Sequence, residues 1–451
     1  MSNPKVITRF APSPTGLLHI GAVRTALFSY LYAKQNSGDF ILRIEDTDTE
    51  RNKPEYEQEI ISDFDWLAFN YGGTFYRQSE RKDLYEKYLA KLIKDGFAYI
   101  SKEEPTIPDP SKEPRRSEVI RFKNPNKKVM FSDLIRGDVT FDTTDLGDFV
   151  IAKSLTEPLY HLAVVVDDFE MKVTHVIRAE EHISNTPRQI LIQQAIGAPQ
   201  PIYAHLPLIL DTERAKLSKR KHGEQVSLLY YIKQGYLRDG IINYLALLGW
   251  NPGTEQEIFT FDELVKVFDI SKVQKSGAIF DPEKLRWINK QHMERLPKAE
   301  LYTRIKETFN DFDIAGDLLE KLAPVVLERI SAFGELKEMA KQGEFDYAFK
   351  SPEYQKEALL WKGKGDFAIL KNRLHSVTQL LEKIGTNEFN KETAKAAIWD
   401  YATAEGRGEV LWPMRYALSG KEKSPDPFVL AELVGKTETL HRLKLAIEKI
   451  S

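Results

Sequence analysis

The chain contains no cysteine among its 451 residues. Disulfide bonds and thiolate-ligated zinc sites are therefore excluded, because both need cysteine sulfur. Long apolar runs are also missing: runs such as Leu162–Val166 are far too short to cross a bilayer, and no apolar signal segment opens the sequence. The net charge is only −3, so the protein as a whole does not attract nucleic acid. We expect a cytoplasmic protein that does not enter a membrane and whose RNA-binding surfaces, if any, are local.

Length and composition describe a folded chain of several domains. Hydrophobic residues make up 42% and charged residues 29%, which is typical of globular proteins and not of disordered ones. At 451 residues the chain is too long for one ordinary core, so two to four domains are expected. No internal repeat is visible.

The first chemically informative segment runs from a strand into a helix. Lys5–Phe10 is strand-like, a turn rich in proline and glycine follows, and apolar residues then repeat at helical spacing from about His19 onward. The start of a helix leaves N–H groups unpaired and carries a partial positive charge, while Gly16 and Gly21 permit a ligand to approach the backbone. This segment therefore predicts a phosphate site.

The second segment is Lys216–Arg220, near the middle of the chain. Its two lysines, Lys216 and Lys219, can supply positive charge to phosphates as negative charge develops during phosphoryl chemistry. Taken alone, a histidine beside a glycine is usually a turn residue, and a lysine-rich run is usually a solvated loop. Both segments in one chain, in this order, favour an ATP-using active site.

Three charged residues mark one edge of the predicted catalytic sheet. We expect buried strands at Lys5–Phe10, Phe40–Ile44, Thr174–Arg178 and Ile202–Leu210. Arg9, Glu45 and Arg178 fall at the carboxyl ends of these strands, which is where open parallel sheets bind ligands. The alternative is that Arg9 and Glu45 form only a structural salt bridge between neighbouring strands. The sheet-edge position favours the pocket.

The remaining regions are predicted from the spacing of apolar residues and from residues typical of helix ends and loops. Thr186 is the expected N-cap of a helix that ends at Gly197. A loop is expected over Glu103–Arg116 and short strands at Val119–Phe122, Val139–Phe141 and Phe149–Ala152. From Leu228 onward the pattern becomes helical, with apolar stripes typical of core faces.

Together these segments resemble the class I aminoacyl-tRNA synthetases and, within them, the bacterial-type glutamyl-tRNA synthetases. Pro12–Ala22 is similar to the family's HIGH-type motif, and Lys216–Arg220 is similar to its KMSKS-type motif. Further family-like segments are Leu42–Asp48, Val176–Gln189, Phe280–Trp287 and Pro413–Gly420. The resemblance covers nearly the whole chain.

The resemblance implies an α/β fold: a class I Rossmann-like catalytic domain with an α+β insertion for the tRNA acceptor end, followed by all-α stem-contact and anticodon-binding domains. The implied ranges are 1–71 and 173–225 for the split catalytic domain, 72–172 for the insertion, 226–296 for the stem-contact domain and 297–451 for the anticodon-binding region, with an internal boundary near 375. The implied protein is a monomer.

The resemblance also implies the reaction and its residues. Glutamate and ATP react to a glutamyl-adenylate, and the glutamyl group then passes to tRNA-Glu. ATP brings Mg²⁺ with it, and no protein-bound metal is expected; some relatives hold a cysteine-ligated zinc, which this chain cannot. The implied catalytic residues are His19, Lys216 and Lys219; those for glutamate are Arg9, Ser13, Glu45, Tyr160 and Arg178; those for ATP are His19, Gly21, Glu181, Lys216, Ser218 and Lys219; those for tRNA are Arg51 and Arg220.

Two positions depart from the family pattern, and a third bears on the choice of tRNA. Ala22 replaces the second histidine of the HIGH-type motif, and Val164 stands where some relatives have asparagine. Ala332 lies near the position where a basic side chain reads the third anticodon base, so charging of tRNA-Gln as well as tRNA-Glu stays open. Basic runs at Arg115–Lys128 and Arg214–Lys221 are either local RNA surfaces or solvated faces.

Two further alternatives are a glutaminyl-tRNA synthetase and a catalytically inactive tRNA-binding paralogue. The former has a C-terminal half built from β-barrels, whereas residues 300 to 451 are predicted to be helical. The latter is disfavoured because the catalytic and pocket residues are all present.

Overall fold

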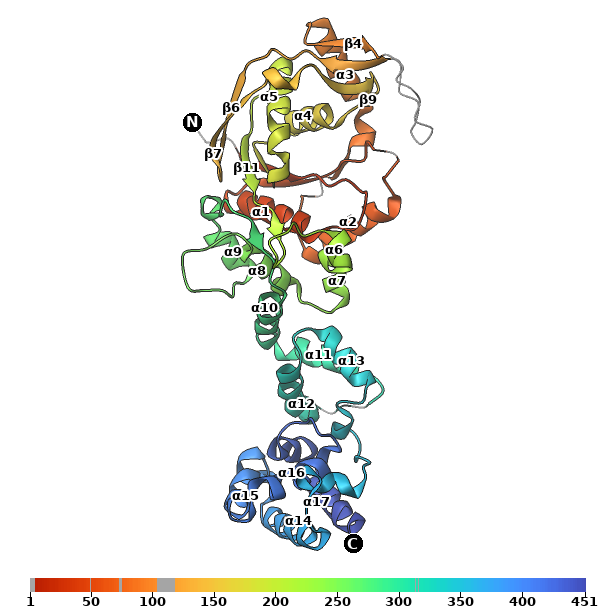
Figure 1. The fold of residues 1–451 in the computed structure, drawn as a ribbon, viewed down its shortest axis with the longest axis vertical. Helices are drawn as coiled ribbons and strands as arrows, with labels where there is room; N and C mark the ends of the chain where they lie inside the picture. Colours follow the sequence, from red (N-terminus) through yellow and green to blue (C-terminus); the bar gives the residue numbers. More distant parts are fainter. Residues whose placement is uncertain (1–4, 49, 73–74, 104–117, 313, 315) are drawn as a thin grey trace. The chain divides into compact units, whose positions relative to one another are not determined.

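The chain forms two compact units, Met1–His292 and Met293–Ser451 (Figure 1). In the computed structural model the described residues are 5–48, 50–72, 75–103, 118–312, 314 and 316–451. Apart from Glu103, the loop predicted over Glu103–Arg116 lies outside them. Each unit is considered separately.

A parallel sheet organises the first unit. Strands β1 (Ile7–Phe10), β2 (Asp39–Ile44) and β3 (Phe75–Arg77) pair in that order, and β10 (His175–Ala179) pairs with β11 (Ile202–Leu206). Thr174 joins the two sets, because its N–H donates to the carbonyl of Ile7 at 2.9 Å. The strands predicted near Arg9, Glu45 and Arg178 are thus confirmed within one or two residues at their ends.

Alternation along these strands separates two cores. Phe10, Phe40 and Leu42 pack with helix α1 (Ile20–Gln35) on one side of the sheet. Ile41 and Val176 pack with the helices α4 (Tyr160–Glu170) and α5 (Thr186–Ile196) on the other. Successive side chains of a strand point to opposite faces of the sheet. Arg9, next to Phe10, and Arg43, next to Leu42, are therefore directed toward α4 and α5.

Helix α1 begins where the sequence predicts. His19 is its N-cap, and Val23, Leu27 and Leu31 are fully buried. The chain then turns back into β2 through Gly38, where a Cβ would lie only 2.2 Å from the carbonyl oxygen of Val6. The strand–turn–helix unit therefore needs a glycine at its second turn.

The insertion is an α+β segment. Its elements are helix α3 (Lys82–Lys94), an antiparallel sheet of β4 (Ala98–Lys102), β5 (Glu118–Phe122), β8 (Phe149–Ser154) and β9 (Glu157–Pro158), and the hairpin β6 (Lys128–Asp133) and β7 (Gly137–Asp142). The hairpin extends the sheet of β10 and β11, because Asp133 pairs with Tyr203 of β11.

Two local predictions were wrong. The single strand expected over Ile202–Leu210 breaks after Leu206, because Pro207 has no N–H to donate, and β12 (Ile209–Leu210) pairs instead with β13 (Ala278–Ile279). Thr186 is the first residue of α5 and not its N-cap, since the 3-10 turn η3 (Glu180–Asn185) leads directly into the helix and makes Asn185 the cap. Gly197 ends α5 in the left-handed conformation, as predicted.

Further helices complete the first unit. They are α2 (Pro54–Leu67), α6 (Lys219–His222), α7 (Leu228–Lys233), α8 (Arg238–Leu247), α9 (Phe261–Val267) and α10 (Pro282–Glu294), the last of which runs into the second unit.

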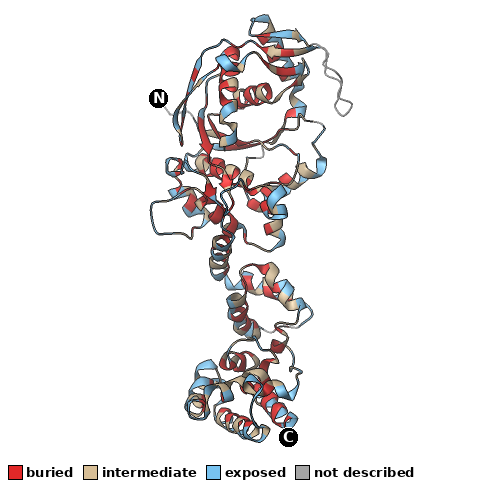
Figure 2. Ribbon diagram, viewed as in Figure 1, coloured by how far each residue is buried: buried red, intermediate tan, exposed pale blue. Residues whose placement is uncertain are grey.

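Helices without a strand make up the described part of the second unit. They are α11 (Lys298–Thr308), α12 (Gly316–Arg329), α13 (Phe333–Lys341), α14 (Phe367–Glu382), α15 (Lys391–Glu405), α16 (Arg407–Ser419) and α17 (Pro427–Lys449). Figure 2 shows their buried faces in red turned toward one another. The predicted stripes behave accordingly: Ile305, Val377 and Leu443 are fully buried.

No described helix combines the length and apolar character that a membrane crossing requires.

Candidate active site

A cavity of about 530 Å³ lies at the carboxyl edge of the parallel sheet, beside the start of α1. Nine of the predicted site residues line it: Arg9, Ser13, His19, Gly21, Glu45, Tyr160, Arg178, Glu181 and Lys216. Three described residues of that set do not belong to its wall: Arg51, Ser218 and Arg220. The side chain of Lys219 lies outside the described part of the structure. Residues from five separate segments thus converge on one cavity.

His19 presents one defined ring nitrogen to this cavity. Its Nδ1 accepts a hydrogen bond from the backbone N–H of Gly21 at 3.0 Å. Burial, and next the ammonium of Lys216, lower the pKa of His19, so the ring is neutral near pH 7. A neutral ring that accepts at Nδ1 carries its proton on Nε2. His19 can therefore donate from Nε2 to a phosphate oxygen without being charged.

Lys216 is held by an acidic partner on the cavity wall. Its Nζ lies 2.5 Å from Oε2 of Glu181, and this bond lowers the pKa of the carboxyl group. Both side chains are about half exposed. The backbone of Lys216 forms a bridge with Leu210, which fixes the position from which the side chain extends.

The loop that carries Lys216 is tied to Asp211. The Asp211 carboxylate accepts from Lys221 Nζ at 2.7 Å and lies 3.0 Å from His222 Nε2. Its Oδ1 also accepts from the backbone N–H of Ala215 at 2.8 Å. These contacts, the bond from Lys221 first, lower the pKa of Asp211 to about 2. A carboxylate that is ionised near neutral pH thus organises both ends of the segment.

Arg9 and Glu45 do not pair with each other in the hydrogen bonds of the described residues. Arg9 Nε instead contacts Asp168 Oδ1 at 3.3 Å, and Glu45 Oε1 accepts from Arg43 Nη2 at 3.0 Å. Arg43, fully buried, also donates from Nη1 to Asp168 Oδ1 at 2.7 Å. The direct salt bridge considered from the sequence is therefore absent from this part of the chain.

Arg43 and Asp168 were not among the site residues predicted from the sequence. The available signal was the acidic pair Asp167 and Asp168 directly after the apolar run Leu162–Val166, in a helix whose other inner residues are apolar. Both carboxylates are buried. Charged residues in a core are almost never left without partners, so such a pair predicts buried cations nearby.

Arg178 is buried and uses its donors on protein partners. It donates to His205 at 3.1 Å, to Gln189 Oε1 at 2.8 Å and to Thr186 Oγ1 at 2.8 Å. Burial lowers the pKa of Arg178. These bonds favour an orienting role for Arg178 at the cavity wall over bidentate binding of a free carboxylate.

Tyr160 starts α4 at the same wall. Its hydroxyl lies 3.2 Å from Nδ1 of His182, and burial raises the pKa of Tyr160. Burial, and next the charge of Arg178, lower the pKa of His182 to about 4, so that ring is neutral and can accept from the hydroxyl. Ser13 lines the cavity close by in the chain segment after β1.

Pro207 and Leu208 form a further part of the cavity wall. Arg24 donates to the carbonyl of Pro207, and Glu180 Oε1 accepts from the N–H of Leu208 at 2.8 Å. Burial lowers the pKa of Arg24 to about 10, which leaves it charged. Arg136 of the β6–β7 turn pairs with Glu180 in turn. Sequence periodicity identified none of these contacts, because they join residues far apart in the chain.

Arg51 and Arg220 are exposed outside the cavity. Arg51 pairs with Asp48 three residues earlier. Of the departures from the family pattern, Ala22 lines the cavity and Val164 is buried in the apolar core beside it, where it offers no hydrogen bond. Among the described residues no group of three His, Asp or Glu side chains is arranged to hold a metal ion.

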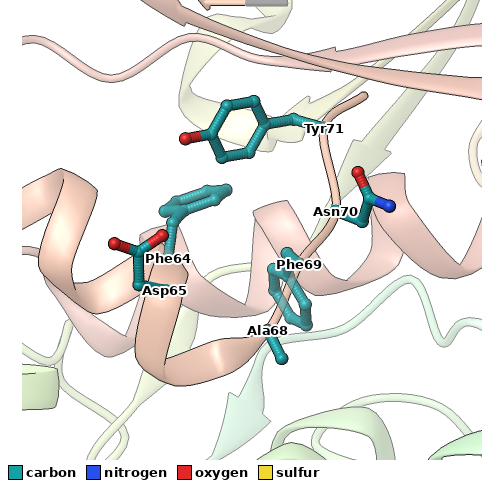
Figure 3. Close-up of a pocket in the computed structure, with 6 residues that line it drawn as sticks. All are labelled: Phe64, Asp65, Ala68, Phe69, Asn70 and Tyr71. Carbon is teal, nitrogen blue, oxygen red and sulfur yellow. The ribbon is translucent and has the colours of Figure 1, made fainter. Parts of the chain in front are cut away.

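A second cavity, of about 380 Å³, lies at the end of α2 (Figure 3). It is lined by Phe64, Asp65, Ala68, Phe69, Asn70 and Tyr71. None of the predicted site residues lines it. The first cavity is therefore the candidate active site.

The chain also matches models of known protein families. The catalytic-domain model of class I tRNA synthetases (E and Q) matches residues 5–107 and 108–287, and an anticodon-binding-domain model matches residues 295–447. The chain belongs to the class I tRNA synthetases of the E and Q family.

The relatives that it matches within that family are glutamate–tRNA ligases. The chain is 39% identical to the glutamate–tRNA ligase of Aquifex aeolicus, over 99% of this chain and 100% of that one. It is 38% identical to the glutamate–tRNA ligase of Carboxydothermus hydrogenoformans, over 97% and 99%. A crystal structure of the glutamate–tRNA ligase from Elizabethkingia meningosepticum in complex with its amino acid matches with a TM-score of 0.86 at 33% identity, covering 99% of this chain and 100% of that one.

Proposed function

We infer that the chain is a glutamate–tRNA ligase, which joins L-glutamate to tRNA at the expense of ATP and releases AMP and diphosphate. The observation that carries this function is the convergence of Arg9, Glu45, His19 and Lys216 on one cavity, in a chain that matches glutamate–tRNA ligases over nearly its whole length. Aminoacylation of purified tRNA-Glu with labelled glutamate tests it directly.

In the first step, the carboxylate of glutamate attacks the α-phosphorus of ATP and diphosphate leaves. No side-chain nucleophile is needed, so the protein accelerates the step by positioning and by stabilising charge. We assign the Nε2–H of His19 and the ammonium of Lys216 to the phosphates. Lys219 belongs with them by its place in the motif. ATP carries Mg²⁺, which offsets phosphate charge when bound.

Glutamate presents an ammonium and two carboxylates, so a selective pocket needs an anion and cationic or donor groups. We assign Glu45 to the ammonium and Arg9 to a carboxylate, with Ser13 and Tyr160 as hydroxyl contacts. Arg178 orients this wall. For ATP we add the backbone at Gly21, together with Glu181 and Ser218.

In the second step, the terminal ribose hydroxyl of tRNA attacks the glutamyl-adenylate and AMP leaves. We propose that residues 72–172 receive the acceptor end, that 226–296 contact the stem and that 297–451, with a boundary near 375, bind the anticodon, while 1–71 and 173–225 form the catalytic domain. The match of an anticodon-binding model to residues 295–447 supports the last assignment. Arg51 and Arg220 are assigned to tRNA because both are exposed cations. The enzyme acts as a monomer.

A second candidate function, charging of tRNA-Gln in addition to tRNA-Glu, is favoured by one observation. Ala332 stands near the position where the family places a basic side chain for the third anticodon base; it is buried and caps α13, so it offers no charge to RNA. Aminoacylation of tRNA-Glu and tRNA-Gln side by side separates the two functions. A glutamylated tRNA-Gln supports the broader one.

A further inference from the structure

Four buried side chains of alternating charge form a continuous row beside the cavity. Arg9 contacts Asp168, Asp168 accepts from Arg43, and Arg43 donates to Glu45, with distances of 3.3, 2.7 and 3.0 Å between the bonded atoms. All four are at most 8% exposed. The two ends of the row, Arg9 and Glu45, line the cavity.

The row leaves a different part of each end residue available. Arg9 contacts Asp168 through Nε alone, so among the described residues its two terminal Nη groups are left for another partner. Glu45 is bonded through Oε1, and its Oε2 takes no bond from the described residues. A free cationic edge and a free anionic oxygen thus border the same cavity.

Without the two middle residues, Arg9 and Glu45 would be each other's best partners. Arg9 lies on β1, Glu45 directly follows the neighbouring strand β2, both are buried and both line the same cavity. Opposite charges attract strongly in a medium of low dielectric. A direct Arg9–Glu45 pair would occupy the groups that a zwitterionic amino acid needs. Asp168 holds Arg9 away, and Arg43 satisfies Glu45 from the other side.

We propose that Asp168 is a positioning residue for the amino-acid substrate: with Arg43, it keeps Arg9 and Glu45 apart and open to glutamate. The inference rests on the proposed glutamate–tRNA ligase function and deepens it. Asp168 acts through Arg9 and is not itself a contact of the substrate. Its effect is therefore specific to glutamate and spares ATP.

Charges around Asp168 agree with this role. Burial opposes its ionisation, but the guanidinium groups of Arg9 and Arg43 outweigh burial and hold the pKa of Asp168 below its usual range. The carboxylate is thus charged throughout the neutral range. A neutral amide at this position would keep the shape but release Arg9.

The chain supplies a matched control. Asp167, the preceding residue of α4, is also a buried aspartate, but its carboxylate accepts from Gln78, Arg81 and Tyr85 and has no hydrogen bond or ion pair with Arg9. Asp167→Asn therefore removes a buried carboxylate from the same helix. Asp167 touches the row only through Arg43, whose Nε lies 3.7 Å from Asp167 Oδ2, and it contacts neither of the two residues that line the cavity.

The test is steady-state aminoacylation of tRNA-Glu by the full-length wild type, Asp168→Asn and Asp167→Asn, with glutamate and ATP varied in turn. We expect Asp168→Asn to raise KM for glutamate by about ten- to hundredfold and to change KM for ATP by less than about twofold. Asp167→Asn should lower the thermal unfolding midpoint and leave KM for glutamate near that of the wild type.

Asp168→Glu tests rescue, because it keeps the charge and moves it by one methylene. Its KM for glutamate should lie between those of the wild type and Asp168→Asn; where Asp168→Asn does not fold, an increase in Asp168→Glu alone carries the test. A wild-type KM for glutamate in every folded Asp168 variant overturns the inference, as does an equal rise for glutamate and ATP. A wild type that does not charge tRNA-Glu overturns the proposed function instead.

Discussion

Lys216 Nζ lies 2.5 Å from Glu181 Oε2 at the edge of the candidate active site. Neither partner is buried, so the pair is worth little to stability. Its value is positional: the ammonium is kept at the wall of the cavity and can transfer to a phosphate that carries more negative charge than one carboxylate. The arrangement suits contacts made mainly in the transition state.

Lys216→Ala should therefore lower kcat for glutamate charging by about 10²-fold or more while changing KM for glutamate little, because it removes charge stabilisation at the phosphates. Steady-state aminoacylation measures both constants. Lys233→Ala, which removes an exposed lysine of the same unit at the end of α7, is the control. A kcat like that of the wild type would exclude Lys216 from the mechanism.

Glu45→Gln should raise KM for glutamate and leave ATP binding intact, because it removes the ammonium partner and no phosphate contact. Loss of one buried charge partner costs about 2–5 kcal/mol. Burial raises the pKa of Glu45 despite the opposing charges of Arg43 and Arg9. The wild type should thus lose glutamate affinity on acidification at a higher pH than a free carboxyl group would dictate, and Glu45→Gln should lack this acid limb. A fall in ATP affinity instead would contradict the assignment.

Local signals predicted much of this site. The turn before His19, the apolar repeat of α1 and the ends of β1, β2 and β10 are each encoded in a short stretch of neighbouring residues, so predicting them needs no knowledge of tertiary structure. The cavity residues predicted from the family motifs also lie in short contiguous segments. The sequence does not predict which charged side chains pair with each other. Arg43 and Asp168 are 125 positions apart, and only the packing of α4 on the sheet brings them together.

Missed elements have equally specific causes. Strand β6 alternates between buried and exposed residues. Met130 occupies one of the exposed positions and is 67% exposed although it is apolar, so the sequence does not show the alternation of apolar and polar residues that would predict a strand. Thr186 has the composition of an N-cap, yet its hydroxyl accepts from Arg178 inside the core. In both cases a tertiary demand outweighed the local pattern.

Asp211→Asn should lower kcat by about tenfold with little change in KM for glutamate, because loss of the charge releases Lys221 and His222 and loosens the segment that carries Lys216. Glu213→Gln is the matched control: its side chain is 76% exposed and shares only the Lys221 contact. Steady-state kinetics of both variants decides the matter. Equal effects in the two variants would show that the Asp211 tether has no role in catalysis.

Asp63→Asn should stabilise the first unit at alkaline pH. Asp63 is buried, Oδ2 has no hydrogen-bond partner among the described residues, and burial together with the charge of Glu59 raises its pKa to about 7. The folded carboxyl group then binds a proton more tightly than the unfolded one, whose pKa is about 3.9, so stability falls as pH rises from about 4 through 7.

An amide in place of Asp63 cannot ionise, and this loss should disappear. The gain over wild type should be on the order of 2–4 kcal/mol at pH 8.5 and should shrink at pH 5. Chemical denaturation at both pH values measures it, with the exposed Asp65→Asn as control. A gain that does not depend on pH would mean that the carboxyl group is not the cause.

A fragment that ends near residue 300 should fold and bind ATP but lose most charging of tRNA. All residues assigned to phosphate and glutamate chemistry belong to the compact unit Met1–His292, and the helices that follow match an anticodon-binding model. A net charge of −3 gives no general attraction that could replace the lost RNA contacts. ATP binding by calorimetry and tRNA-Glu charging at physiological salt, compared with the full-length enzyme, measure the two activities. Equal charging by fragment and full-length enzyme would show that the helical unit does not read the anticodon.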